Sequence, residues 1–237
     1  MSIARMNITN TEVWGFKHAL RGMRNPLNSW SRADSHYADT WDAKAGSSFS
    51  AEDDNAGVDP FFIGENDLDL AKRLIKAGGE HRKFLRMIHV SADVNMPRYW
   101  WSEEDTYHFN VKNSCSTMHK LLNNPNPITR ELFLYCKEDE DIIDIMVERL
   151  ERLRQEYKST KNYEEKTMLL VRAKRLLPEG FLQMRTLDTN YEELRNEYFQ
   201  RRNHRLSEEW VDTFCRWIES LPYAAELICY EGKDEKN

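Results

Sequence analysis

The sequence predicts a single α+β domain, with helices packed on a small mixed or antiparallel sheet. Apolar residues recur at helical spacing in segments 65–77, 139–157 and 163–177. Segment 84–94 instead alternates apolar and polar residues, as a half-buried strand does. Because no internal repeat or linker divides the chain, we expect one domain over residues 1–237.

The N-terminal part predicts one short helix followed by an irregular segment. We expect a helix at Val13–Met23, because Asn10 and Thr11 are suitable N-caps and Asn25-Pro26 ends it. Residues 28–63 are rich in Ser, Asp, Ala and Gly, which predicts a long irregular insertion. Either its aromatic side chains pack it onto the domain, or it is a partly ordered surface segment. Those side chains are Trp30, Tyr37, Trp41, Phe61 and Phe62.

The rest of the chain predicts a series of helices and strands with recognisable ends. In order, they are a helix at Glu65–Ala77, a strand at Phe84–Val94, a short helix at Met96–Trp101, a strand at Thr106–Val111, helices at Ser114–Leu122, Asp139–Tyr157 and Tyr163–Leu177, a strand at Phe181–Leu187, a helix capped by Asn190 to about His204, and a helix capped by Ser207 to about Ser220. The short loop between segments 139–157 and 163–177 predicts a helical hairpin. The charged tail from Glu231 is expected to fray.

Composition excludes some classes of function. The chain has 237 residues and a net charge of -6, which argues against nonspecific nucleic-acid binding. The spacing of its four cysteines gives no zinc pattern, so we expect no metal and free thiols in a cytoplasmic protein. No apolar run approaches the about 20 residues of a membrane span, and the N-terminus lacks the apolar core of a signal peptide.

The segment after the predicted strand 84–94 places two tryptophans beside three acidic residues. Trp100 and Trp101 precede Glu103, Glu104 and Asp105. The carboxylates could act in acid–base chemistry or bind a hard divalent cation. The alternative is a solvated acidic loop with both indole rings in the core. Further on, Cys115 and His119 lie one helical turn apart, as a nucleophile and base do, although this spacing is common by chance.

The C-terminal third carries a motif of defined spacing. Leu177-Pro178 ends a predicted helix, Asn190 opens another that contains Leu194, Arg201 follows eleven residues after that asparagine, and Glu209 lies in an acidic helix start. This pattern resembles the C-terminal half of flavin-dependent thymidylate synthases, the ThyX type. The helix, the strand and the run Arg98-Tyr-Trp-Trp also resemble the middle of that family.

The resemblance implies a ThyX-like fold, FAD as cofactor and a nucleotide of the dUMP type as ligand. It also implies a homotetramer with sites shared between subunits. Under it, Arg201, Arg98, Arg185 and Tyr107 are candidate substrate-binding residues, and Trp100, Trp101 and Asn190 are candidate cofactor-binding residues. A bidentate guanidinium suits phosphate, and aromatic rings suit stacking. The helix dipole alone also favours arginines such as Arg201 in a last helical turn.

The chain departs from this family at one motif. Where the family presents Arg-His-Arg, this sequence has Ser102-Glu103-Glu104. Replacing two cations removes charge-assisted contacts of about 1.5–3 kcal/mol each, which speaks against FAD binding through this loop in the family's manner. The sequence therefore predicts a diverged ThyX-like protein that binds a dUMP-type nucleotide or methylates a deoxyuridine nucleotide. The alternative is a non-catalytic binding protein with this fold, of viral (phage-like) or mobile-element origin.

Overall fold

The computed structural model describes residues 6–37, 57, 58 and 60–232. Trp41, most of the expected insertion at 28–63 and the end of the tail lie outside the described residues. None of the helices in the described ranges is long and apolar enough to cross a membrane.

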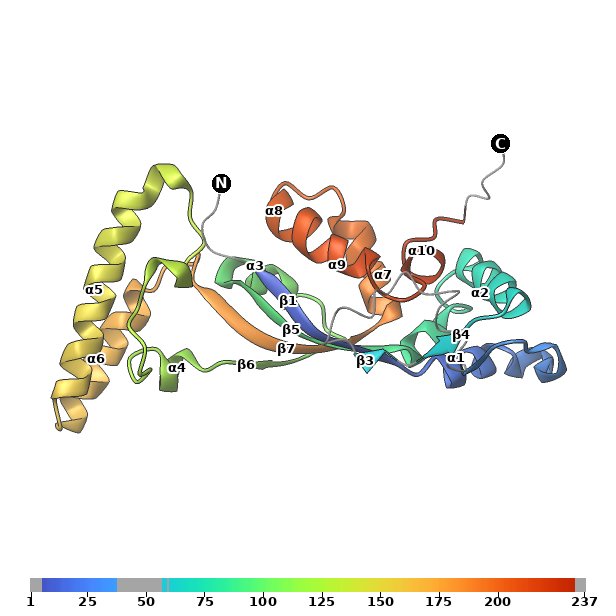
Figure 1. Cartoon of the computed structure of the whole chain (residues 1–237), viewed down its shortest axis with the longest axis horizontal. Coiled ribbons are helices and arrows are strands. Elements are labelled where there is room, and N and C mark those ends of the chain that lie inside the picture. Colours follow the sequence, from blue (N-terminus) through green and yellow to red (C-terminus); the bar gives the residue numbers. More distant parts are fainter. Residues whose placement is uncertain (1–5, 38–56, 59, 233–237) are drawn as a thin grey trace. The chain divides into compact units, whose positions relative to one another are not determined.

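The main sheet has five strands in the spatial order β3-β1-β5-β7-β6 (Figure 1). They are β1 (Asn7–Trp14), β3 (Gly57–Val58), β5 (His89–Pro97), β6 (Val111–Ser114) and β7 (Leu182–Asn190). Strands β1 and β3 pair in parallel, with Glu12 opposite Gly57. A second, antiparallel pair joins β2 (His36–Tyr37) to β4 (Phe61–Phe62). With the helices described below, this sheet confirms the predicted α+β class.

Strand β5 follows the alternation in its sequence. Val90, Ala92 and Val94 are buried, whereas the polar residues between them are half-buried. The polar side chains bond across the sheet: Thr186 donates its hydroxyl to Asp93 at 2.6 Å. Hydrogen bonds from Thr186 and Asn10 lower the pKa of Asp93. The apolar side chains on one face of this strand are therefore buried, and Asp93 on the other face accepts hydrogen bonds.

The chain divides into two compact units. Unit 1 comprises Met1–Asn7, Val94–Thr106 and Asn113–Arg185. Unit 2 comprises Ile8–Asp93, Tyr107–Lys112 and Thr186–Asn237. Strands β5 and β7 each contribute residues to both units. The expectation of a single domain stays a prediction.

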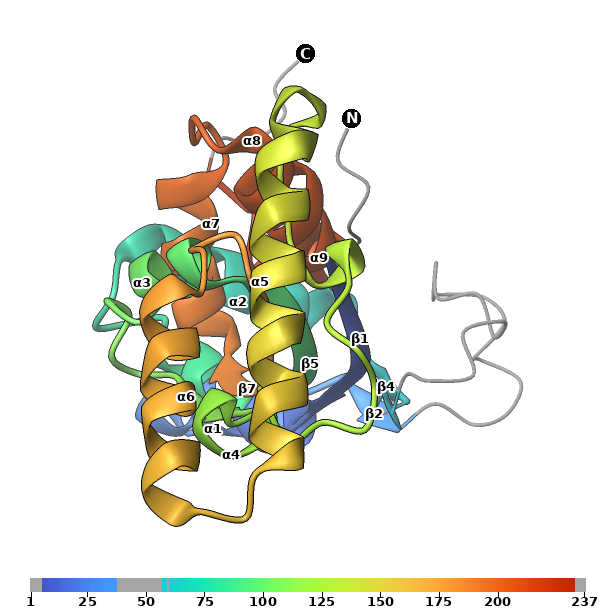
Figure 2. The same ribbon diagram turned by 90° about the vertical axis from the view of Figure 1, so that its left-hand side faces the viewer.

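Unit 1 contains the predicted helical hairpin. Helices α5 (Glu140–Ser159) and α6 (Tyr163–Leu176) lie side by side in both views (Figures 1 and 2). Asn162 caps α6 by accepting the backbone N–H groups of Glu164 and Glu165. An apolar cluster joins the hairpin to the segment before it, formed by Leu121, Leu122, Ile128, Phe133, Ile143, Leu150, Leu153, Leu169, Ala173 and Leu177. Unit 1 also holds α3 (Arg98–Glu104) and α4 (Thr117–Lys120).

Unit 2 contains the other α-helices of the described residues and the 3-10 helix that precedes β5. These helices are α1 (Phe16–Met23), α2 (Glu65–Ala77), the 3-10 helix η4 (Lys83–Met87), α7 (Tyr191–Arg201), α8 (Ser207–Glu209), α9 (Arg216–Glu219) and α10 (Ala224–Leu227). A six-residue π-helical segment, Trp210–Cys215, joins α8 to α9. The Tyr191 side chain is fully buried, packs edge-on against Phe16 and donates its hydroxyl to the carbonyl of Pro222 at 2.6 Å. It ties α7 to α1 and to the segment between α9 and α10.

Several predicted boundaries differ from the structure. The helix expected at Val13–Met23 begins only at Phe16. Gly15 has a φ of 100°, a left-handed conformation that separates the end of β1 from the start of α1. The strand expected at Thr106–Val111 was wrong in position, since β6 starts at residue 111. The N-cap predicted at Ser207 was wrong: Leu206 is the N-cap of α8, and Ser207 is the first residue of the helix.

Candidate ligand-binding pocket

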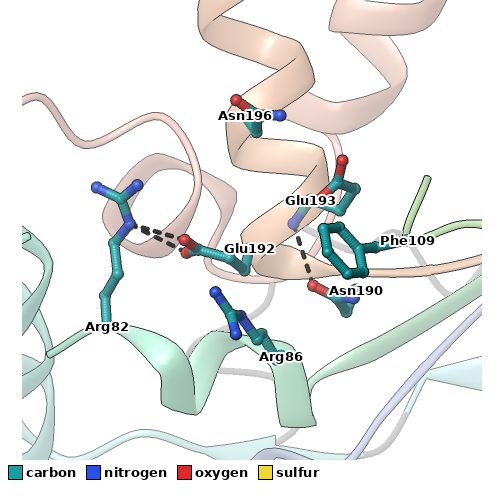
Figure 3. A pocket seen from close by; sticks show the side chains of 7 residues that line it. All are labelled: Arg82, Arg86, Phe109, Asn190, Glu192, Glu193 and Asn196. Atoms are coloured by element: carbon teal, nitrogen blue, oxygen red, sulfur yellow. Dashed lines mark hydrogen bonds and ion pairs between the residues drawn. The ribbon is translucent and has the colours of Figure 1, made fainter. Parts of the chain in front are cut away.

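A pocket of about 230 Å³ lies in unit 2 where helix α7 begins (Figure 3). Seven side chains line it: Arg82, Arg86, Phe109, Asn190, Glu192, Glu193 and Asn196. They come from three segments far apart in sequence, namely the region around η4, the loop 107–110, and the end of β7 with the first turns of α7. Tertiary structure, not a local motif, assembles this pocket.

The first turn of α7 is fixed by its N-cap. The Asn190 side-chain oxygen accepts the backbone N–H of Glu193 at 3.0 Å, which confirms the predicted cap. Acidic residues at 192 and 193 in this turn are favourable with the helix dipole. The cap therefore holds Asn190 and the two acidic residues at one wall of the pocket (Figure 3).

Two of the four charged lining residues neutralise each other. The Arg82 Nε donates to both carboxylate oxygens of Glu192, at 3.1 and 3.0 Å. Their side chains are 28% and 12% exposed, so the pair is only partly screened by water. The charge balance at the pocket thus depends mainly on Arg86 and Glu193.

Glu193 is a buried carboxyl group that faces the pocket. The residue is only 8% exposed. Burial raises its pKa, as does the neighbouring Glu192 charge, against a hydrogen bond with Asn196 and the charges of Arg86 and Lys112. A carboxyl with a raised pKa inside a pocket is a typical feature of a binding or catalytic site.

Phe109 presents an aromatic ring to solvent at the same pocket. It is 78% exposed, although its loop is held firmly by the next residue. The Asn110 amide donates to Glu197 at 2.8 Å, and the Thr189 hydroxyl donates to the Asn110 oxygen at 2.5 Å. An exposed ring on an anchored loop can stack on a flat ligand, and amide side chains such as Asn196 can bind the ligand's polar edge.

Two of the sequence-predicted residues form a separate cluster in unit 2. The Arg201 guanidinium lies over the rings of Tyr107, at 5.4 Å, and of Trp210, at 4.3 Å. Its Nε donates to the Tyr107 hydroxyl at 2.8 Å, and its Nη1 is 3.1 Å from His204 Nε2. The structure therefore brings Arg201 and Tyr107 together, and cation–π contacts fix the guanidinium.

Four other predicted residues lie in unit 1, where Arg185, Trp101 and Trp100 are in contact and Arg98 pairs elsewhere. The Arg185 guanidinium is 4.4 Å from the Trp101 ring and bonds Asp105 at 2.9 and 3.1 Å. Trp101, fully buried, donates its ring N–H to a backbone carbonyl at 2.8 Å. Trp100 is also fully buried and packs edge-on against it. Arg98 forms an ion pair of 3.4 Å with Glu179.

The acidic run after the tryptophans is only partly at the surface. Glu104 is fully buried, Glu103 is half-buried and Ser102 is exposed. Within the described ranges, no group of three His, Cys, Asp or Glu side chains is placed to hold a metal ion.

Among the residues that line the pocket, Asn190 is the one that the sequence indicated as a candidate site residue. Arg82 and Arg86 lie four residues apart before β5, and Phe109 follows the acidic run, but none belongs to a recognisable motif. The basic run between positions 81 and 86 was the one available signal. It predicts a positive surface and does not indicate that Glu192 neutralises one of its arginines.

The chain resembles known proteins in its fold and not in its sequence. No family model and no curated protein sequence matches the chain. Its fold, in contrast, is that of the flavin-dependent thymidylate synthases, which confirms the ThyX-like resemblance at the level of the fold.

Two solved structures of thymidylate synthase X from Helicobacter pylori show this. One, with FAD and dUMP, is 16% identical with a TM-score of 0.64, over 94% of this chain and 97% of that chain. The other, complexed with the same two ligands, is 17% identical with a TM-score of 0.64, over 94% and 98%.

Proposed function

We propose that this protein binds a nucleotide-type ligand, FAD or dUMP, by placing a planar ring of the ligand against Phe109. The observation that carries the proposal is the 78% exposed Phe109 ring at the pocket beside Asn190 and Asn196. Aromatic side chains stack on flat heterocyclic rings, and an exposed ring on an anchored loop is available for such a contact. The solved structures with this fold were obtained with FAD and dUMP, which supports the same ligand class.

The pocket fits the heterocyclic part of such a ligand and not the whole molecule. Its volume of about 230 Å³ is below the about 300–1,000 Å³ of pockets that enclose a drug-sized ligand. Because Glu192 neutralises Arg82, only Arg86 among the lining residues offers a cation that is not ion-paired within the pocket. FAD, when bound, supplies hydride chemistry. In this proposal Asn190 and Asn196 orient the ring and Phe109 covers one face.

The residues that would hold the phosphate stay predictions from the sequence. Arg201 with Tyr107, and Arg98 and Arg185 with the two tryptophans, are the proposed substrate- and cofactor-binding groups outside this pocket. Arg201 already contacts Tyr107 and His204, so a ligand phosphate would have to add to these contacts or replace them. The predicted homo-oligomer is checked by sedimentation velocity.

The first test is to measure ligand binding directly. We expect the purified protein to carry a flavin or nucleotide, seen by absorption and mass spectrometry, or to gain thermal stability with FAD or dUMP. Phe109→Ala should weaken binding about tenfold or more, since base stacking contributes about 1–3 kcal/mol. Tyr163→Ala is the matched control, because Tyr163 is 82% exposed on α6 in unit 1 and its loss should leave affinity unchanged. Protein that carries no ligand and responds to neither compound would refute the proposal.

Methylation of a deoxyuridine nucleotide is the finer proposal, and binding without chemistry is the second candidate. The second is favoured by Glu103 and Glu104, which stand where the resembling family has cationic side chains, Glu104 being fully buried. An assay for dTMP from dUMP, with FAD, a reductant and methylene-tetrahydrofolate, separates the two. Product formation supports the enzyme, and tight binding without turnover supports the second candidate.

A further inference from the structure

The carboxyl group of Glu193 is placed to do more than line the pocket. Its backbone N–H is held by Asn190 at 3.0 Å, and the residue is 8% exposed. Its side chain faces the pocket in the same region as Phe109 and Asn196 (Figure 3). A ligand ring stacked on Phe109 would therefore share the pocket with this carboxyl group.

The groups around Glu193 set its protonation. Glu192 lies on the same helix and is neutralised by Arg82, whereas Arg86 approaches from η4 and Lys112 from β6. Burial and Glu192 raise the pKa of Glu193, and the bond with Asn196 and the two cations only partly oppose this. A ligand ring that expels water would strengthen the effect of burial and favour the neutral acid further.

We propose that Glu193, as a neutral carboxylic acid, selects ligands whose ring carries a lactam edge, a C=O beside an N–H. This inference rests on the proposed nucleotide-binding function of the pocket. A carboxylic acid has an O–H donor beside a C=O acceptor, so it forms two antiparallel hydrogen bonds with a lactam. The ionised carboxylate can only accept, and it would face the ligand carbonyl oxygen with repulsion. Uracil and the pyrimidine ring of flavin both have this edge.

A pH dependence of binding follows. Affinity is constant where Glu193 is protonated in the free protein. It falls by up to tenfold per pH unit once the pH exceeds the pKa of Glu193, because binding then requires uptake of a proton. If the ionised carboxylate instead bound a cationic ligand, affinity would rise as pH increases.

The test uses calorimetric titration of the full chain with dUMP and with FAD between pH 5.5 and 8.5, in two buffers of different ionisation enthalpy. We expect wild-type affinity to fall as pH rises, with measurable proton uptake. Glu193→Gln keeps a donor and an acceptor in the same places, so its affinity should be independent of pH. Glu193→Leu removes both and should bind at least tenfold more weakly at the lowest pH. N3-methyluridine, whose N–H is blocked, should compete more weakly than uridine with the wild type only.

Controls keep the two proposals separate. Asp69→Asn removes an exposed carboxylate on α2 that does not line the pocket, and it should retain the wild-type pH slope. Wild-type binding that is independent of pH, together with Glu193→Leu binding as wild type, would overturn the role of Glu193 and leave the pocket function standing. Absence of binding by the wild type at every pH would overturn both. Circular dichroism and the melting temperature confirm that each variant is folded.

Discussion

Two regions of this protein each bring together an aromatic ring, an arginine and a carboxyl group, but the ring is buried in one region and exposed in the other. In unit 1, Trp101 is fully buried, Arg185 lies 4.4 Å over its ring, and Asp105 pairs with that arginine at 2.9 Å. In the unit 2 pocket, the Phe109 ring is 78% exposed, and burial raises the pKa of the Glu193 carboxyl.

The difference lies in what satisfies each group. In unit 1 the arginine lies over the ring and pairs with the carboxylate, although its buried Nε makes no hydrogen bond with the described residues, so these side chains are held mainly by one another. In the pocket the ring faces solvent, and burial of the Glu193 carboxyl group outweighs its hydrogen bond with Asn196 and the nearby cationic charges, so a ligand has something to add. Residue type alone does not separate these cases, because both contain the same three kinds of side chain.

The largest expected contrast is in stability. Trp101→Ala should lower the free energy of unfolding by about 3–5 kcal/mol, because it leaves a cavity and removes the ring N–H bond to the backbone. Phe109→Ala should change it by less than about 0.5 kcal/mol, because the ring is already in water. Urea unfolding followed by fluorescence and circular dichroism measures both. Equal losses in the two variants would erase the distinction between the regions.

Carboxyl groups of the two units should also respond to acid with opposite sign. In unit 1, hydrogen bonds from Arg154 lower the pKa of Glu151 from 4.5 to about 2. Its folded pKa lies below the unfolded value, so its contribution is present above about pH 4.5 and is lost as pH falls towards about 2. Glu193 has a raised pKa, so stability falls as pH rises above its ordinary value of 4.5.

Variants of each residue isolate these two contributions. Glu151→Gln should lose about 1.5–3 kcal/mol at neutral pH, since Arg154 is only 8% exposed and would lose its partner, and its stability should vary less between pH 2 and 4.5. Glu193→Gln should flatten the decline above pH 4.5. Urea midpoints measured from pH 2 to 8 report both. A parallel change in the two variants would contradict the assigned directions.

The sequence predicts those parts of this structure that bury a regular face. The stripe of α2 and the alternation of β5 are visible because packing requires them. The start of α5 is not, since Ile142 and Ile145 are 55% and 63% exposed and Ile143 is buried instead. Strand β1 is not, because Val13 is its only fully buried residue and its other side chains carry no period. Likewise Asn190 is readable as a cap, whereas Phe109 joins the pocket through the hydrogen bonds of Asn110, which no local pattern encodes.

The smallest expected effect concerns the ion pair of unit 1. Asp105 is 47% exposed and Arg185 is 17% exposed, so Asp105→Asn should cost only about 0.2–1 kcal/mol at low salt and less at high salt. The guanidinium should stay over the Trp101 ring, because the cation–π contact does not depend on Asp105. Asp69→Asn is the control, since its pair with Arg73 on α2 is 68% exposed at the carboxylate and should contribute still less. Urea unfolding of both variants, at low salt and at about 1 M salt, makes the comparison. A loss above about 2 kcal/mol for Asp105→Asn would exceed the contribution that an exposed ion pair makes to the free energy of unfolding. It would show that the carboxylate holds the arginine and tryptophan in place.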